Sequence, residues 1–162
     1  MAGNLTLKYI TPTTGTVTLA SLATSAGGVT GRASTAIDNS TNQYVDYLVQ
    51  ITVKNGSGTI AANKGWWVFA YGVGGSAYDD GITGTDAGFT RTDPPNLPLL
   101  MFINAPTSAG SEVSKTVSIA SAFGGTCPYK WGIFVANDTN ITADSTAGNF
   151  SLSIIAVEAQ YT

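Results

Sequence analysis

Carboxylates are the side chains of this 162-residue sequence that gather closely enough to suggest chemistry. Four of the ten acidic residues lie in one glycine-rich stretch: Asp79, Asp80, Asp86 and Asp93. Calcium takes six to eight oxygen ligands, and two carboxyl groups about 5 to 9.5 Å apart can hydrolyse a glycosidic bond. The stretch lacks the spacing and the closing Glu of a calcium loop, and neighbours such as Asp79 and Asp80 point to opposite faces of an extended chain. We therefore expect a solvated loop that binds no metal and no cofactor.

Proton-transfer groups are scarce in the rest of the chain. There is no histidine, and the glutamates are Glu112 and Glu158. A serine or threonine nucleophile needs a base and an oxyanion site, yet no Gly-x-Ser-x-Gly elbow is present. The glycines after residue 71 lead into Tyr78-Asp79-Asp80-Gly81 and not into a helix, so they read as a turn. This inventory favours a structural or binding protein over an enzyme.

The charge content is low, at 10% of residues compared with about 25% in a typical soluble domain. Thr, Ser, Asn and Gly must therefore solvate the surface. The net charge is −3 and the seven basic residues are scattered, so we expect no nucleic-acid partner. No apolar run is long enough to span a bilayer, and the first residues lack the features of a secretory signal. We expect a protein that is made and used without export and has no membrane partner.

Length and cysteine content predict one domain over residues 1–162, stabilised by its core. The single cysteine, Cys127, cannot form a disulfide within the chain. Two interpretations remain for it: a bridge to a second chain, or a small residue in a turn beside Pro128.

Apolar residues alternate with polar ones in the clearest segments, which predicts β-strands. Val45, Tyr47, Val49, Ile51 and Val53 share one face of a half-buried strand. Strand-like runs, bounded by Gly, Pro, Asn or Asp, are Leu5–Ile10, Thr16–Leu22, Tyr44–Val53, Trp66–Tyr71, Leu97–Asn104, Glu112–Ile119, Trp131–Ala136 and Phe150–Val157. Eight such strands predict an all-β fold, a jelly-roll-like antiparallel sandwich whose core includes Val49, Ile51, Leu152 and Ile154.

Three segments modify this outline. Pro98 cannot donate a ladder hydrogen bond, so its strand is expected to begin at Leu99 or to lie at an edge. The last run is apolar on both faces, which predicts a central or doubly covered strand. The stretch Thr24–Gln43 is small and polar, and is expected to hold one short helix or to form a loop.

Aromatic residues offer candidate contact sites. Trp66 and Trp67 are adjacent, so alternation sends one ring inward and the other outward. The outward ring either stacks on a sugar or a partner, or is covered by a neighbouring loop. Trp131 reads as core. The candidate partner-binding residues are Trp67, Tyr78, Asp79, Asp80 and Arg91.

The order of several segments resembles a group of small virion proteins of tailed bacteriophages. The resemblance runs from about Leu5 to the C-terminus and rests on structural segments: Tyr44–Val53, Trp66–Gly72, Tyr78–Gly81, Leu97–Leu99, Ala120–Gly125 and Lys130–Gly132. It implies a head decoration, or cement, protein: a jelly roll that gathers as homotrimers on the lattice of the major capsid protein. It also implies assembly in the host cytoplasm and a final place on the virion surface.

Two hypotheses follow. In the first, the protein binds the outside of the capsid and stabilises the head, with Met1–Ile10 and the loop from Tyr78 to Arg91 as contact regions. Met1–Ile10 would act by adding a strand to a neighbour. In the alternative, the protein is a carbohydrate-binding or receptor-binding component of the phage tail, with Trp66, Trp67 and the same loop as its surface.

Overall fold

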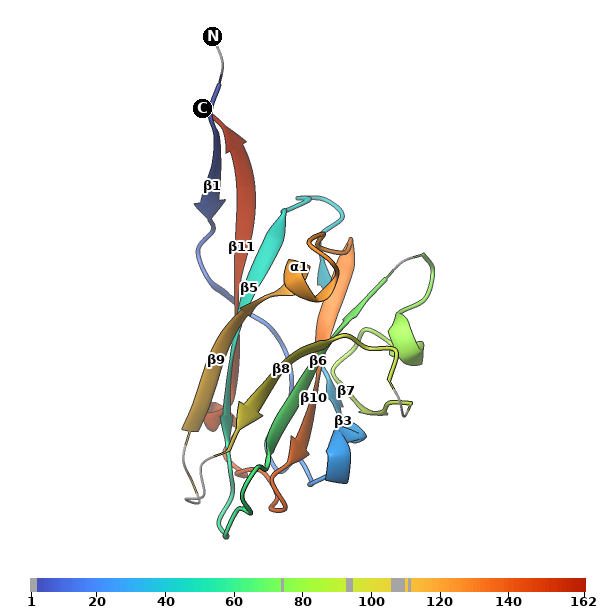
Figure 1. Ribbon diagram of the computed structural model, residues 1–162, viewed down its shortest axis with the longest axis vertical. Coiled ribbons are helices and arrows are strands. Elements are labelled where there is room, and N and C mark those ends of the chain that lie inside the picture. The colour runs from blue at the N-terminus through green and yellow to red at the C-terminus, as the bar shows by residue number, and fades with distance from the viewer. Residues whose placement is uncertain (1–2, 74, 93–94, 106–109, 111) are drawn as a thin grey trace.

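The structure is a computed structural model that describes residues 3–73, 75–92, 95–105, 110 and 112–162. The described residues form two antiparallel sheets that pack face to face, which confirms the predicted all-β sandwich (Figure 1). Its strands are β1 (Leu5–Tyr9), β2 (Thr13–Thr14), β3 (Thr30–Ala33), β4 (Ile37–Asp38), β5 (Asp46–Lys54), β6 (Gly65–Gly72), β7 (Ala87–Thr90), β8 (Leu99–Asn104), β9 (Glu112–Ser118), β10 (Lys130–Asp138) and β11 (Ser151–Tyr161). One short helix, α1 (Ile119–Ala122), begins at Ser118, whose side chain accepts a hydrogen bond from the backbone of Ser121.

The strand order is that of a jelly roll. The first sheet runs β1-β11-β5-β9, with β2 also paired to β11. The second sheet runs β7-β3-β10-β6-β8, with β4 also paired to β10. Eight of these strands follow the chain path of two Greek keys: they alternate between the sheets, except that β6 and β8 follow one another in the second sheet, and β2, β4 and β7 are short additions. The last strand, β11, lies between β1 and β5, as its two apolar faces predicted.

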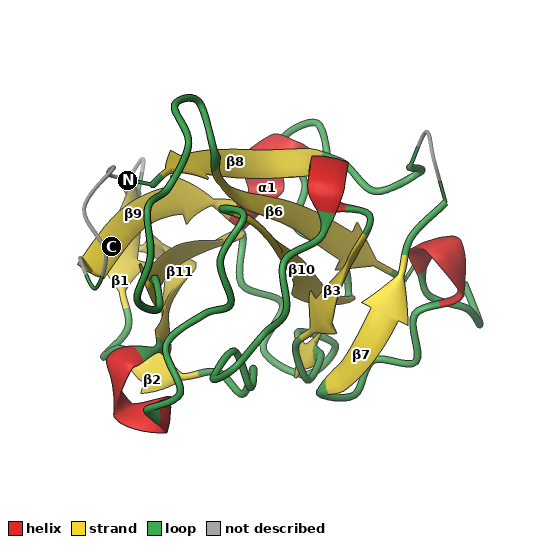
Figure 2. Cartoon of the chain, turned by 90° about the horizontal axis from the view of Figure 1, so that it is seen from below, coloured by secondary structure: helices red, strands yellow, loops and turns green. Residues whose placement is uncertain are grey.

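Two stretches differ from the prediction. Thr16–Leu22 is not a strand, because this segment crosses from one sheet to the other, from the backbone of Leu152 on β11 to that of Asn137 on β10. Leu19, only 1% exposed, fills the gap between the sheets on the way. The missing jelly-roll strand is β3, within Thr24–Gln43, a stretch that was expected to hold one short helix or to form a loop. The same stretch contains a short 3-10 helix at Ala26–Gly28. Figure 2 shows the loops that cross the lower end of the sandwich.

The main core lies between the two sheets. Val49, Ile51, Leu152 and Ile154 are all 3% exposed or less, which confirms the predicted core residues. The second sheet contributes the largest buried side chains of this core, Trp66 and Trp131. Asn55 accepts a hydrogen bond from the indole of Trp66 at 2.9 Å, so this ring is held by packing and by a polar contact.

A second apolar cluster lies on the outer face of the second sheet. Strands β6 and β10 turn one set of side chains into the main core and the alternate set outward, where Phe69, Tyr71 and Phe134 are no more than 5% exposed. Gly132 on β10 leaves the space that the Tyr71 ring occupies, since a Cβ there would lie 2.2 Å from that ring. A segment that follows β6 covers this cluster.

Replacing Ile51 with Ala should lower the free energy of unfolding by about 2–5 kcal/mol, because the side chain is fully buried and its removal leaves a cavity. Urea unfolding followed by far-ultraviolet circular dichroism measures the change. The matched control is Gln50→Ala on the exposed face of the same strand. A loss as small as that of the control, or a spectrum dominated by helix, would contradict this fold.

Candidate partner-binding surfaces

Residues 78–92, here called the covering loop, lie over the outer cluster of the second sheet. The loop contains a short 3-10 turn at Asp79–Gly81 and the edge strand β7. Its apolar side chains Tyr78, Ile82 and Phe89 pack downward on the cluster. The Tyr78 ring meets Tyr71 edge to face at 5.6 Å, and Phe89 meets Phe134 in the same way at 5.7 Å. The covering loop is therefore a packed layer and not a solvated excursion.

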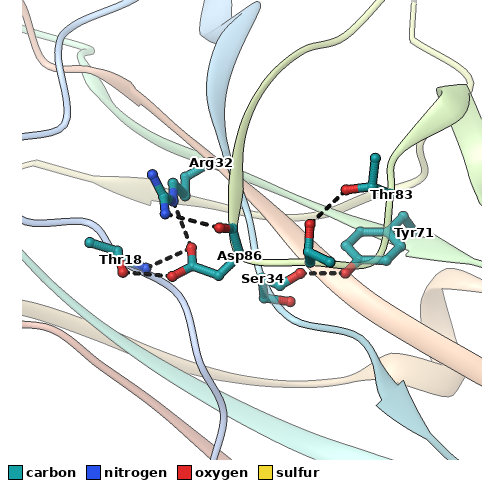
Figure 3. A network of polar contacts seen from close by, with 7 residues as sticks. Thr18, Arg32, Ser34, Tyr71, Thr83 and Asp86 are labelled. Carbon is teal, nitrogen blue, oxygen red and sulfur yellow. Dashed lines mark hydrogen bonds and ion pairs between the residues drawn. The ribbon is translucent and has the colours of Figure 1, made fainter.

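Asp86 anchors the middle of this loop. Its carboxylate accepts hydrogen bonds from the Arg32 guanidinium at 2.6 Å and from the Thr18 hydroxyl at 2.6 Å, and both side chains point toward it in Figure 3. Partial burial of Asp86 would raise its pKa, but these partners outweigh that effect and hold the pKa below its ordinary value. Asp86 thus joins the covering loop to β3 and to the crossing segment.

The two adjacent aspartates also hold the loop. Asp79 accepts a hydrogen bond from the backbone N–H of Gly72 at 2.8 Å, at the end of β6. Asp80 accepts one from the Asn96 amide at 2.7 Å and another from the Thr92 hydroxyl at 3.2 Å. The two residues lie in a 3-10 turn and not in the extended chain assumed from the sequence, and each carboxylate has its own partners within the protein. Asp93 lies outside the described residues.

Arg91 and Trp67 are placed differently from what a contact role requires. Arg91 is 8% exposed, and its guanidinium donates to the backbone oxygens of Gly27 and Gly28 at 2.8 and 2.9 Å while lying 5.0 Å from the centre of the Phe69 ring. Trp67 is half-buried beneath Gly28 and packs on Phe69 and Phe102. The outward tryptophan is therefore covered by a neighbouring loop, and neither Trp66 nor Trp67 offers a bare stacking surface for a sugar.

Threonine and glycine form the outward side of the covering loop. The sequence analysis missed this surface because it considered charged and aromatic residues as contact sites. The signal that could have revealed the surface is the recurrence of threonine along the loop. Thr83 and Thr85 share a hydrogen bond at 2.8 Å, and Thr90 meets Thr30 of β3 at 3.2 Å. The exposed residues of this threonine face are Gly81, Thr83, Thr85, Gly88, Thr90 and Thr92.

A shallow pocket of about 410 Å³ lies beside the turn that contains Cys127. Its apolar part includes Tyr129, 49% exposed, and Val45, 43% exposed. Val45 was expected on the buried face, but it precedes the first residue of β5 and lies at the surface. Burial, with the nearby Asp46 carboxylate, raises the pKa of the Cys127 thiol to about 12. The thiol therefore stays protonated near neutral pH, where disulfide exchange needs the thiolate.

The two ends of the chain form an arm. Residues Leu5–Lys8 of β1 and Glu158–Tyr161 of β11 pair with each other beyond Asp46, the first residue of β5, and we call this pair the terminal arm. Figure 1 shows it projecting from the sandwich. The backbones of Asn4 and Thr162 continue the ladder with hydrogen bonds of 2.8 and 3.0 Å. The N-terminal strand was predicted to add to a neighbouring subunit; in the structure it pairs within its own chain.

The geometry defines a class of protein, an all-β jelly-roll sandwich with a covered second sheet, and comparison adds no relative to it. No family model, curated protein or solved structure matches the chain. Among the described residues, no three His, Cys, Asp or Glu side chains gather as a metal site requires. In the same part of the chain, no helix is long and apolar enough to cross a membrane.

Replacing Asp86 with Asn should lower the free energy of unfolding at neutral pH by about 1.5–3 kcal/mol, the range for hydrogen bonds to charged groups. The pKa of Asp86 is lowered on folding, so its stabilisation is present above the unfolded-state value near 3.8 and is lost as pH falls through the folded-state pKa. Wild type should therefore lose more stability than the variant on acidification below about pH 4. Urea unfolding across this pH range measures both effects.

The control for Asp86 is Glu158→Gln, which removes an exposed ion pair with Lys8 and should cost little. Equal stability losses in the two variants would contradict the anchoring role of Asp86.

Chelation should leave the melting temperature unchanged, because the carboxylates of the covering loop already have partners within the protein. Differential scanning fluorimetry with EDTA, and then with added calcium, makes the measurement. A fall with EDTA that calcium reverses would show that Asp79, Asp80, Asp86 and Asp93 bind a metal.

Proposed function

We propose that this chain is a viral structural protein, a decoration or cement protein that binds the major capsid protein lattice of a tailed bacteriophage and stabilises the head. The observation that carries the proposal is the threonine face, an outer surface of threonine and glycine on a loop whose charged side chains form hydrogen bonds within the protein. In this proposal the protein acts as a homotrimer, is not an enzyme, and is assembled in the host cytoplasm before it lies on the virion surface.

The covering loop suits docking on a large protein surface. It is held by Asp79, Asp80, Asp86 and Arg91, so little conformational freedom remains to be lost on binding. Threonine hydroxyls can donate and accept hydrogen bonds, and burying them avoids the cost of burying charge. Tyr78 packs on the inner side of the covering loop and supports the threonine face, while the threonines would contact the capsid.

Durable attachment would come from repetition. Contacts through a small, uncharged face are individually weak, but several copies linked in one oligomer bind a lattice with much greater avidity. The scarcity of charge supports this use of the surface, since charged residues are depleted from the cores of interfaces.

The test uses undecorated phage heads and the purified chain. Added protein should bind the heads and delay the release of DNA on heating. Thr83→Glu combined with Thr90→Glu should weaken binding at least about tenfold, because two charges would be buried without partners. Thr59→Glu, an exposed threonine in the β5–β6 connection, is the matched control. Failure to bind heads would contradict the proposal.

The pocket beside Cys127 favours a second candidate, a carbohydrate-binding or receptor-binding tail component. Tyr129 offers an exposed ring there, and Ser40, Gln43 and Thr126 line the same pocket with polar groups. A glycan array separates the candidates: reproducible sugar binding that Tyr129→Ala abolishes would support the tail component, and a decoration protein should give no reproducible signal.

A further inference from the structure

We propose that copies of this chain associate with one another through the outer face of the terminal arm. The inference rests on the homotrimer of the proposed function and names the surface that would form it, whatever the threonine face binds. The occupant of the surface is a second copy of the chain, and its apolar side chains meet those of its copies around a shared symmetry axis.

The register of β1 and β11 places the apolar side chains of the arm on one face. Leu5 lies opposite Tyr161, and Leu7 lies opposite Ala159. Directly opposed residues of an antiparallel pair point to the same side of the sheet. Thr6 with Gln160, and Lys8 with Glu158, form the other face, where Lys8 and Glu158 are 3.7 Å apart as an ion pair.

The apolar side of β11 changes along the strand. In the body of the sandwich, Leu152, Ile154 and Ala156 point into the core, while Ser151 and Ser153 face outward. In the arm the pattern reverses: Glu158 and Gln160 continue the core-facing side, and Ala159 and Tyr161 continue the outer side. The second sheet does not reach the arm (Figure 1), so polar residues face the side where the core has ended.

The apolar strip continues from the arm onto the first sheet. Tyr9 lies opposite Val157, and Ile155 lies opposite Leu48 of β5, all on the outer face. Farther along the same face the opposed pairs become polar, Ser153 with Gln50 and then Ser151 with Thr52. The outer strip consists of Leu5, Leu7, Tyr9, Leu48, Ile155, Val157, Ala159 and Tyr161. Its exposed part lies toward the end of the arm, since Leu48 and Ile155 are half-buried and Val157 is buried.

The outer strip of the first sheet is exposed, whereas the outer apolar cluster of the second sheet is covered. There the chain covers its outer apolar cluster with residues 78–92. Along the outer strip, Leu5 is 67% exposed, Leu7 59%, Tyr9 62% and Tyr161 80%. An arm of two strands without a core is only marginally stable by itself in water. A partner that covers the strip would stabilise the arm, and a second copy is present wherever the chain is made.

The composition and size of the strip also fit a copy of the same chain. Homomeric interfaces are more apolar than transient ones, and the exposed side chains of the strip, Leu5, Leu7, Tyr9 and Tyr161, carry no charge. At the inner end of the strip, Asp46 lies opposite Val157, where its carboxylate accepts a hydrogen bond from the backbone of Ala120. A buried aromatic side chain contributes about 150–250 Å², so two tyrosines and two leucines at these exposures offer roughly 500 Å² per copy. This is the larger part of the about 800 Å² that each partner gives to a stable interface.

The test is sedimentation velocity of the purified chain over a wide range of concentration. Wild type should form an oligomer, and Leu5→Thr combined with Leu7→Thr should raise the dissociation constant by about tenfold or more. Threonine keeps the strand preference of these positions while removing apolar area. The matched control is Leu99→Thr on β8, since Leu99 is also exposed, at 51%. A second test variant is Tyr161→Thr on the strip, and its matched control is Tyr129→Thr outside it.

Spin labels provide a measurement without altering the outer strip. In a Cys127→Ser background, Lys8→Cys places the label on the opposite face of the arm, and Thr59→Cys places it in the β5–β6 connection at the other end of the molecule (Figure 1). Pulsed dipolar spectroscopy should give a shorter distance between copies for position 8 than for position 59.

Three results would overturn the proposal. The first is a wild-type chain that stays monomeric at all concentrations. The second is an oligomer that the Leu5 and Leu7 changes leave intact. The third is a monomer that loses head binding on the same changes, because that result would mean that the capsid binds this strip. Failure of the wild-type oligomer to bind heads would instead contradict the proposed function and leave self-association standing.

Discussion

The burial of β6 and β10 on both faces is the constraint on which most of the structure depends. These neighbouring strands direct Trp66, Val68 and Ile133 into the core between the sheets, and direct Phe69 and Phe134 to the opposite side. A jelly roll has two layers, so its own second sheet can cover only one of these sides. The covering loop supplies the third layer, and its tethers to β3, to β6 and to the crossing segment follow from that need.

Some of the few charged side chains of this protein hold that third layer in place, and others form ion pairs at the margin of the second sheet. Asp86 with Arg32, and Lys64 with Asp138, form ion pairs of 2.6 and 2.8 Å at the margin of the second sheet. Removing such groups from water is costly unless every lone pair and proton finds a partner. Backbone groups complete the set, as the carbonyl oxygens of Gly27 and Gly28 do for Arg91. Because these charged groups are engaged within the protein, the outer surface of the covering loop consists largely of threonine.

The sequence allowed the sandwich to be predicted because alternation is strong where a strand has one buried face, as in residues 46–53. It failed for Thr16–Leu22, which has strand-like composition but crosses between the sheets, and for β3, whose four residues Thr30–Ala33 are too few to show a pattern. For Arg91 and Trp67, residue type suggested contact with a partner. Their burial depends on segments distant in the sequence, at Gly27–Gly28 and at Phe102, which periodicity does not show.

The same limit explains why the terminal arm went unnoticed in the sequence. Near its C-terminal end β11 is apolar on both faces, and this pattern was expected to mean a central strand or one covered on both sides; the strand is central, but the cover on its outer face is missing from the arm. The register shows that β11 has two amphipathic halves, the first apolar on its core-facing side and the second apolar on its outer side. The halves overlap at residues 155–157, where Ala156 faces the core and Ile155 and Val157 face outward. A sheet with this reversal has two apolar surfaces, and the second sheet of the same chain covers one of them. The other runs to the end of the arm, where the ladder from Leu5 to Tyr161 holds its side chains in place, so a partner that covers it meets a preformed surface.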